Sequence, residues 1–303
     1  MSETSLTSLG SNSSTIDARW RTYRVAAWLG WKVESNWADP LVFFIYAVMR
    51  PISTALVLLL MYVVIAGPQR GGFFDYIYIS NALYLIAMQA IANMSWTILE
   101  DREHYRTLKY IYTAPISLYW YLIGRATARM LIGIMTCLFL LVVGSLLLGL
   151  HLSFGSVQWA WLAVYFPLGM IVLISFGIII AGLALLVPRN GEFIGEILAG
   201  MLLLVCSVYF PPDILPSVLR KLSLAMPVTY WLEGMRRALT GGILQMDNGS
   251  GAISPILASY SNATLAMILL VSGILSATFA YFFYQTIERL AKARGMIDKT
   301  TGF

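Results

Sequence analysis

Long apolar runs alternate with short polar breaks along most of the chain, and this pattern predicts its elements. The runs cover residues 40–66, 73–99, 126–148, 159–187, 193–210 and 262–284. A helix needs about 20 apolar residues to cross the hydrocarbon of a bilayer. The run between Arg129 and Arg189 holds no Lys, Arg, Asp or Glu and is too long for one crossing, so we expect it to fold back at the polar dip at 149–158. The pattern predicts an all-α polytopic membrane protein with six transmembrane helices in a domain at residues 38–287.

The N-terminal flank of this domain is polar and has two parts. Residues 1–16 are rich in Ser, Thr and Asn, and we expect a mobile cytoplasmic tail. Residues 17–37 interleave tryptophans with arginines and Lys32. Trp favours the headgroup region and basic residues favour the anionic cytoplasmic leaflet, so we expect an interfacial amphipathic helix. A soluble helix packed on a partner is the alternative.

Composition supports the membrane class. The chain is 59% hydrophobic and 12% charged, whereas soluble domains carry about 25% charged residues. Most of its 20 basic residues lie in the N-terminal segment, at 102–129 and in a tail at 288–303. The positive-inside rule then favours cytoplasmic termini in a plasma (inner) membrane protein. The distribution of the basic residues also argues against nucleic acid as a partner, because they form no single patch.

Residues 211–245 interrupt the apolar pattern with several prolines and glycines. Two short helices fit, near 217–225 and 228–239, and neither is long enough to span. We expect a re-entrant helical hairpin on the outer side, packed against protein. Its basic residues run against the positive-inside rule: Arg220, Lys221, Arg236 and Arg237.

The densest charge cluster between two spans lies in a loop at residues 100–121. Such a cluster cannot lie in hydrocarbon, and a plain connector would need only about 2–8 residues. We therefore expect a short cytoplasmic helix that docks on a separate soluble motor protein, with a solvated loop as the alternative. The candidate coupling residues are Glu100, Asp101, Arg102, Glu103, His104, Arg106, Thr107, Leu108 and Lys109.

A second set of residues is predicted to line a translocation path. Arg50 falls inside the first span, where an unpaired cation costs about 2.5–3.5 kcal/mol; it could line the path, pair with a neighbour or snorkel to the interface. Glu192 and Glu196 share a helix face at the start of the fifth span and could equally serve its dipole. The candidate lining residues are Arg50, Glu196, Tyr209, Tyr230 and Trp231.

Other polar and reactive residues predict no chemistry of their own. Arg125 and Arg129 begin the third span and are expected to anchor it at the interface. Cys137 and Cys206 lie in apolar runs and are expected to be packed thiols. The histidines show no metal-ligand spacing, and HExxH, GxSxG and phosphate-cradling GxxxxGK[ST] motifs are absent. We predict no enzyme activity and no catalytic, cofactor or metal residues, with ATP and Mg²⁺ held by the partner ATPase.

The motif order resembles the membrane subunit of type-2 ATP-binding-cassette (ABC) exporters of the drug, lipid or polysaccharide type. The likeness covers roughly residues 17–290. Its motifs are Asp101-Arg102-Glu103, Thr107-Leu108, Ala114-Pro115-Ile116-Ser117, Phe210-Pro211-Pro212, Leu215-Pro216, Met226-Pro227-Val228-Thr229-Tyr230 and Leu232-Glu233-Gly234-Met235-Arg236. One position departs from the family pattern, which commonly has Gly before Thr-Leu where this chain has Arg106.

The resemblance implies a dimer of six-span subunits, with a second permease subunit that is a copy of this chain and two cytoplasmic ABC ATPase subunits. The apolar spans favour export of an amphipathic, drug-like or lipid-like substrate. Export of a polysaccharide or lipid-linked glycan is the alternative within the family. A gradient-driven secondary transporter is the alternative outside it, although that class predicts buried ionisable residues at the midplane and repeated halves.

Overall fold

The computed structural model describes most of the 303-residue chain. The described residues are 4–35, 49, 52–53, 56–57, 60, 72–114, 116–147, 149–150, 152, 155–187, 191–244, 246–247, 252–253 and 256–295. Most of the predicted span at 40–66, together with its Arg50, lies outside this set, as does the end of the basic tail.

The described chain is helical apart from one two-residue strand pair. Its elements are α1 (Thr4–Ser35), α3 (Gly72–Leu99), η1 (Glu100–His104), α4 (Leu108–Thr113), α5 (Leu118–Leu147), α6 (Trp159–Leu186), α7 (Glu192–Val205), η2 (Pro212–Ile214), α8 (Ser217–Ala225), α9 (Pro227–Thr240), β1 (Met246–Asp247), β2 (Ala252–Ile253), η3 (Ile256–Ser259) and α10 (Asn262–Ala293). β1 and β2 pair antiparallel, with Met246 opposite Ile253, inside a segment predicted to be a loop.

Four described helices are long and apolar enough to cross a membrane: α3 with η1, α5, α6 and α10. The helices predicted at 73–99, 159–187 and 262–284 are confirmed by α3, α6 and α10, and the two short helices of the hairpin by α8 and α9. The fifth predicted span is shorter than expected, because α7 ends at Val205 and Ser207 turns the backbone to a φ of 61°. A helix of this length reaches only about 21 Å.

Three helices begin earlier or end later than the sequence predicts. α5 begins at Leu118, inside the predicted 100–121 loop, and α10 continues to Ala293, where Lys292 pairs with Glu288 one turn back. α1 begins at Thr4, so the segment expected to be a mobile tail forms the first part of this helix. Once a helix is nucleated, each added residue costs little, which allows it to extend into a polar segment.

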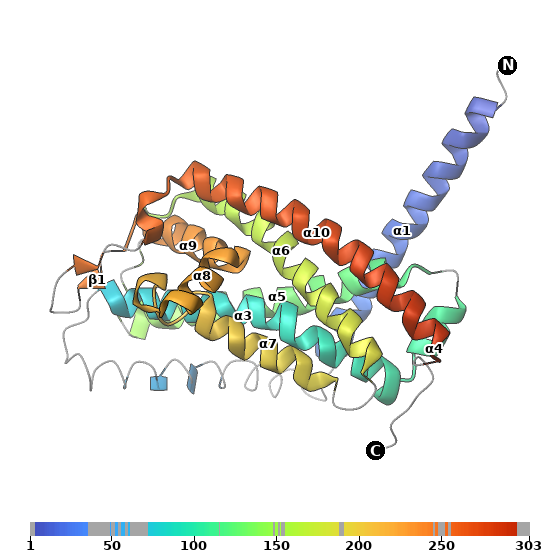
Figure 1. Cartoon of the computed structure of the whole chain (residues 1–303), viewed down its shortest axis with the longest axis horizontal. Helices are drawn as coiled ribbons and strands as arrows, with labels where there is room; N and C mark the ends of the chain where they lie inside the picture. The colour runs from blue at the N-terminus through green and yellow to red at the C-terminus, as the bar shows by residue number, and fades with distance from the viewer. Residues whose placement is uncertain are drawn as a thin grey trace.

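The helices run side by side along the longest axis of the molecule (Figure 1), and α3 lies among α5, α6 and α7. α8, α9 and the strand pair lie at one end, hereafter the α9 end, while α4 lies at the other, the α4 end. Most residues of α3 are buried, including Ile79, Ala82, Ala90 and Ile91. α3 is thus the central helix of the described bundle.

The second half of α1 packs closely on α5, while its first half projects away from the bundle in Figure 1. At Gly124 of α5, a Cβ would lie 2.6 Å from the Tyr23 carbonyl oxygen and 2.7 Å from the Ala26 Cβ. Gly30 of α1 faces Ala128 in the same way, at 2.8 Å. These small residues let the two backbones approach each other, so α1 is bound to the bundle through α5.

Candidate functional site

The central segment, residues 100–113, begins directly at the end of α3. η1 is a π-helical extension of α3 that carries Glu100 to His104, and α4 begins at Leu108 after a short turn. Arg106 occupies this turn with a φ of 52°, a conformation that favours glycine. This is the position at which the resemblance predicted Gly, so the backbone takes the shape that Gly would allow.

One side of the central segment forms an exposed aromatic and basic surface. Tyr105 and Tyr110 are 45% and 66% exposed. The exposed members of the predicted coupling set are His104, Arg106 and Lys109. The Lys109 Nζ lies 5.2 Å from the Tyr110 ring centroid. The predicted coupling set was based on charged residues and motif positions, so it did not include the two tyrosines. Aromatic residues are enriched at protein interfaces, and this was the signal that could have found them.

The other side of the central segment is anchored inside the subunit. Asp101, Arg102 and Leu108 are buried, at 2%, 3% and 1% exposure. Leu108 joins a cluster with residues of α3, α5, α6 and α10, and the Thr107 hydroxyl donates to the Asp101 carbonyl oxygen at 3.4 Å. Asp101 and Arg102 thus do not face outward in this structure: Asp101 lies beside Arg125, and Arg102 lies 3.5 Å from Glu103. Their part in coupling stays a prediction.

A buried network, the Arg129 cluster, ties the start of the central segment to α1 and α5. It consists of Glu34, Glu100, Asp101, Arg125 and Arg129. The Arg129 Nη2 lies 2.7 Å from Glu34 and 2.9 Å from Glu100, and the Arg125 Nη2 lies 3.5 Å from both Glu100 and Asp101. Arg125 and Arg129 were expected to be interfacial anchors. Instead they are 1% and 7% exposed, because carboxylates from two other elements pair with them.

Two further hydrogen bonds extend the Arg129 cluster. The Tyr121 hydroxyl donates to Asp101 at 2.8 Å, and the Arg129 Nε donates to the Thr97 hydroxyl at 3.2 Å. Burial raises the pKa of Glu34 above its ordinary value, and Arg129 offsets this only in part. The ion pair of Glu34 therefore carries an uncompensated cost of desolvation.

A second network, the Arg236 cluster, lies at the α9 end and consists of Tyr76, Ser80, Ser207, Glu233 and Arg236. The guanidinium group of Arg236 donates to the Ser80 hydroxyl at 2.7 Å, the Ser207 carbonyl at 2.9 Å and the Glu233 carboxylate at 2.7 Å. It also lies 4.0 Å from the Tyr76 ring centroid. The Tyr76 hydroxyl donates to the same Ser207 carbonyl at 3.0 Å.

Glu233 explains why the hairpin tolerates basic residues. Its carboxylate also accepts from the Arg237 Nε at 2.8 Å, so Arg236 and Arg237 share one buried counter-charge. Burial raises the pKa of Glu233, but the two guanidinium groups outweigh it, and the pKa lies below its ordinary value. These arginines are buried inside the fold and are not exposed loop charges. They therefore do not count among the loop residues to which the positive-inside rule applies. Arg220 is likewise occupied, by the carbonyls of Pro212, Asp213 and Leu215.

The candidate lining residues have different surroundings in the described structure. Glu196 is exposed on α7, where the Trp96 Nε1 donates to it at 3.4 Å. Tyr209 is half-buried, and Tyr230 donates to the Leu224 carbonyl at 2.7 Å. Trp231 is 1% exposed and lies against Gly169 of α6. Trp231 therefore packs as a core residue in this conformation. Arg50 lies outside the described residues.

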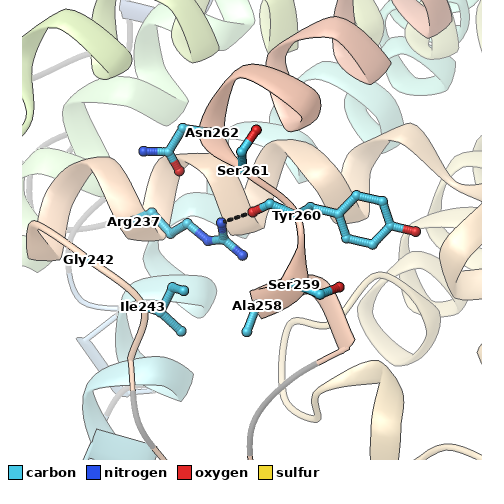
Figure 2. Close-up of a pocket in the computed structure, with 8 residues that line it drawn as sticks. All are labelled: Arg237, Gly242, Ile243, Ala258, Ser259, Tyr260, Ser261 and Asn262. Carbon is cyan, nitrogen blue, oxygen red and sulfur yellow. Dashed lines mark hydrogen bonds between the residues drawn. The ribbon is translucent and has the colours of Figure 1, made fainter.

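A small open pocket of about 440 Å³ lies at the α9 end (Figure 2). Its lining is Arg237, Gly242, Ile243, Ala258, Ser259, Tyr260, Ser261 and Asn262. Figure 2 shows Arg237 at its centre, donating to the Tyr260 carbonyl at 2.7 Å. The same guanidinium donates to the Leu257 carbonyl and to Glu233. Its donors are used within the chain, so the pocket offers no free charge to a ligand.

The remaining chemistry of the described residues is structural. Cys137 and Cys206 are buried free thiols, which confirms the prediction of packed cysteines. No group of three or more His, Cys, Asp or Glu among the described residues could hold a metal ion.

Comparison with known proteins identifies the family. The model of the ABC-2 type transporter family matches residues 23–240, which include the last part of α1, the central segment and the α8–α9 hairpin. The comparison with curated proteins finds no match. The family match covers both clusters and agrees with the apolar helices of a multi-pass membrane protein. The chain belongs to the ABC-2 type transporter family and is a membrane subunit of an ABC transport system.

Proposed function

We propose that this subunit is the permease of an exporter that is driven by ATP hydrolysis in a separate cytoplasmic ATPase. In this proposal the ATPase binds the exposed side of the central segment. The observation that carries it is the two-sided character of that segment: Tyr105, Arg106, Lys109 and Tyr110 are exposed, whereas Asp101 and Leu108 are anchored in the bundle. A surface built this way would receive a push from a partner and pass it to α3 and α5.

The proposed partner surface has the chemistry of a protein interface. Exposed tyrosines supply large contact area at low entropic cost, and the flanking basic residues favour an acidic or carbonyl-lined groove. The charges of a plain solvated loop would have no need of the buried Asp101 and Leu108 anchors. This contrast favours docking over the solvated-loop alternative.

The proposed substrate is amphipathic, drug-like or lipid-like. In the described helices, Arg125, Arg129, Glu233, Arg236 and Arg237 are buried and form ion pairs within the chain. Paired charges offer little to a small polar ion, and they also disfavour a gradient-driven carrier, which needs ionisable groups that change partners within the spans. Two copies of the chain, two ATPase subunits and cytoplasmic termini in the plasma membrane complete the proposal.

The test is the subunit content of the complex purified gently from its native membrane, compared between wild type and a Lys109→Glu/Tyr110→Ala variant. We expect a nucleotide-binding subunit to co-purify with the wild-type chain. The amount that co-purifies with the variant should be at least ten-fold lower, while the amount of the variant itself in the membrane is unchanged. A ten-fold loss corresponds to about 1.4 kcal/mol of binding free energy, which one tyrosine at the centre of an interface can supply.

The matched control is Lys221→Glu, which reverses an exposed charge at the α9 end. It should leave the amount of co-purified ATPase unchanged. A chain that purifies without any nucleotide-binding subunit, or a Lys109→Glu/Tyr110→Ala variant that retains it, would contradict the proposal and favour a gradient-driven carrier.

A further inference from the structure

The two buried clusters lie at opposite ends of the same helix, α3. Tyr76 and Ser80 of the Arg236 cluster are near its start, and Thr97, which contacts Arg129, is near its end. At 1.5 Å per residue, Tyr76 and Thr97 are about 30 Å apart along the helix axis, which is about the thickness of bilayer hydrocarbon. α3 therefore connects the two clusters across the depth of a membrane.

Between the clusters, α3 has the properties of a rigid element. It contains no proline, and Gly72, its only glycine, is its first residue. Kinks in helices arise at proline, at small-residue pairs or at inserted turns. The π-helical turns of η1 follow α3 and lie beyond Thr97. The helix is buried against α5, α6 and α7 over most of its length.

At the α9 end, Arg236 binds three elements at once. It contacts Tyr76 and Ser80 of α3, the Ser207 carbonyl just after α7, and Glu233 of its own helix. The guanidinium group is 2% exposed, so its contacts exclude water. Separating α9 from α3 would remove the Ser80 hydrogen bond and the Tyr76 ring contact from a buried guanidinium group, so the two helices are expected to move together.

We propose that α3 transmits displacement of the central segment to the α8–α9 hairpin, with Arg236 as the positioning residue that joins α9 to α3. The inference rests on the proposed function for the origin of the displacement and goes beyond it in naming the path and the residue. Movement at the α4 end then reaches the α9 end through one rigid helix clamped at both ends.

The neighbouring Arg220 provides a matched comparison. It is an arginine of the hairpin whose guanidinium group also donates several hydrogen bonds. Its acceptors are the carbonyls of Pro212, Asp213 and Leu215, which belong to the hairpin itself. Loss of Arg220 would loosen the hairpin locally and leave the link to α3 intact. Loss of the α3 contacts of Arg236 would break the link.

The experiment measures amide hydrogen exchange in the purified complex with its ATPase, without nucleotide and with ATP plus vanadate. Peptides covering residues 100–113 and 227–240 report the two ends. In wild type we expect ATP to change exchange at both. A Tyr76→Leu/Ser80→Ala variant, which leaves the Arg236–Glu233 pair in place, should keep the change at 100–113 and lose it at 227–240. Arg220→Met should keep both.

The outcomes separate the two proposals. No ATP-dependent change at 100–113 in wild type would overturn the proposed function and the transmission path with it. A change at 100–113 with none at 227–240 in wild type would overturn the path alone. A double variant that keeps the change at 227–240 would overturn the role of Arg236. If the double variant does not accumulate, Ser80→Ala, which removes the hydrogen bond of Arg236 to α3, should show a reduced change at 227–240, and an undiminished one would overturn that role.

Discussion

The Arg129 cluster and the Arg236 cluster solve the same problem, a buried arginine, in different ways. At the α9 end, Arg236 has three hydrogen bonds of 2.7–2.9 Å and an aromatic ring beside it, and its carboxylate partner is 6% exposed. At the α4 end, Arg129 has carboxylate contacts of 2.7 and 2.9 Å, but Arg125 reaches its carboxylates only at 3.5 Å, and Glu34 and Glu100 are 19% and 30% exposed. The clusters therefore differ mainly in the access of water to their carboxylates, which is small in the first and larger in the second.

This difference indicates separate mechanical roles. A buried cluster with little access to water is costly to open and holds elements in one arrangement. In the second cluster, Arg125 and Arg129 share Glu100, which is partly accessible to water, so we expect these pairings to be exchanged at a lower cost. We therefore expect the α9 end to stay fixed to α3, while the contacts among α1, α5 and the central segment readjust.

The largest expected effect comes from removing the counter-charge of each cluster. Glu233→Gln leaves two buried guanidinium groups without a full partner and should destabilise the protein by about 3–5 kcal/mol. Glu34→Gln should cost about 1 kcal/mol or less, because Arg129 keeps Glu100 at 2.9 Å. Denaturant unfolding in detergent measures both. Equal losses would remove the distinction between the clusters.

The next effect concerns the contact that holds α1 to α5 beside the Arg129 cluster. Gly124→Ala places a Cβ within 2.6–2.8 Å of the α1 backbone and of Ala26, so the helices must shift, at a cost of about 2 kcal/mol. Gly200→Ala in α7 is the control, since nothing lies within 4 Å of its Cβ, and it should gain up to about 1 kcal/mol. Thermal unfolding compares the two, and a neutral Gly124→Ala would show that α1 is loosely held.

A smaller effect is expected in the turn of the central segment. Arg106 has a φ of 52°, which costs a residue with a Cβ roughly 1–2 kcal/mol. Arg106→Gly should therefore stabilise the isolated subunit by about 1 kcal/mol, measured by denaturant unfolding. Arg106→Ala keeps the Cβ and should bring no gain. A gain for both would mean that the side chain, and not the backbone, carries the strain.

The smallest expected effect is a difference in pH dependence. The pKa of Glu34 lies above its ordinary value of 4.5, so the folded state binds this proton more readily and its stability should rise as pH falls from neutral toward 4.5. The pKa of Glu233 is lowered, so its contribution is complete above its ordinary value and is lost only as pH falls below about 4.5. Glu34→Gln should reduce the slope of the unfolding free energy above pH 4.5, leaving the part from Asp101, whose pKa is also raised, and Glu233→Gln should leave that slope unchanged. Equal slopes in wild type and Glu34→Gln would contradict this assignment.

Hydropathy and turn chemistry were enough to predict the helices α3, α6, α8, α9 and α10, because each is bounded by polar residues, glycine or proline and its apolar length is readable from the sequence. The start of α5 was missed because the aromatic residues at 118–121 read as part of a polar loop. Tyr119 contacts Tyr281 of α10 and Tyr121 contacts Asp101 of η1, and hydropathy does not reveal these contacts.

The charge clusters show where sequence reasoning stops. Arg129 pairs with Glu34 and Glu100, which belong to elements far from it in the sequence. No local residue spacing predicts this pairing. Glu233, in contrast, precedes Arg236 and Arg237 by three and four residues, which is the helical spacing for ion pairs. That signal was present in the sequence and would have corrected the count of exposed basic residues in the hairpin.

The surface of the central segment is the most direct place to test the account. A photoreactive residue at Tyr110, 66% exposed at the α4 end, would be compared with one at Val218, 76% exposed at the α9 end, in native membranes. The account predicts a crosslink to a nucleotide-binding protein from position 110 and none from position 218, with mass spectrometry identifying the product. A nucleotide-binding protein crosslinked from 218, or none from either position, would contradict the claim that an ATPase drives this subunit through residues 100–113.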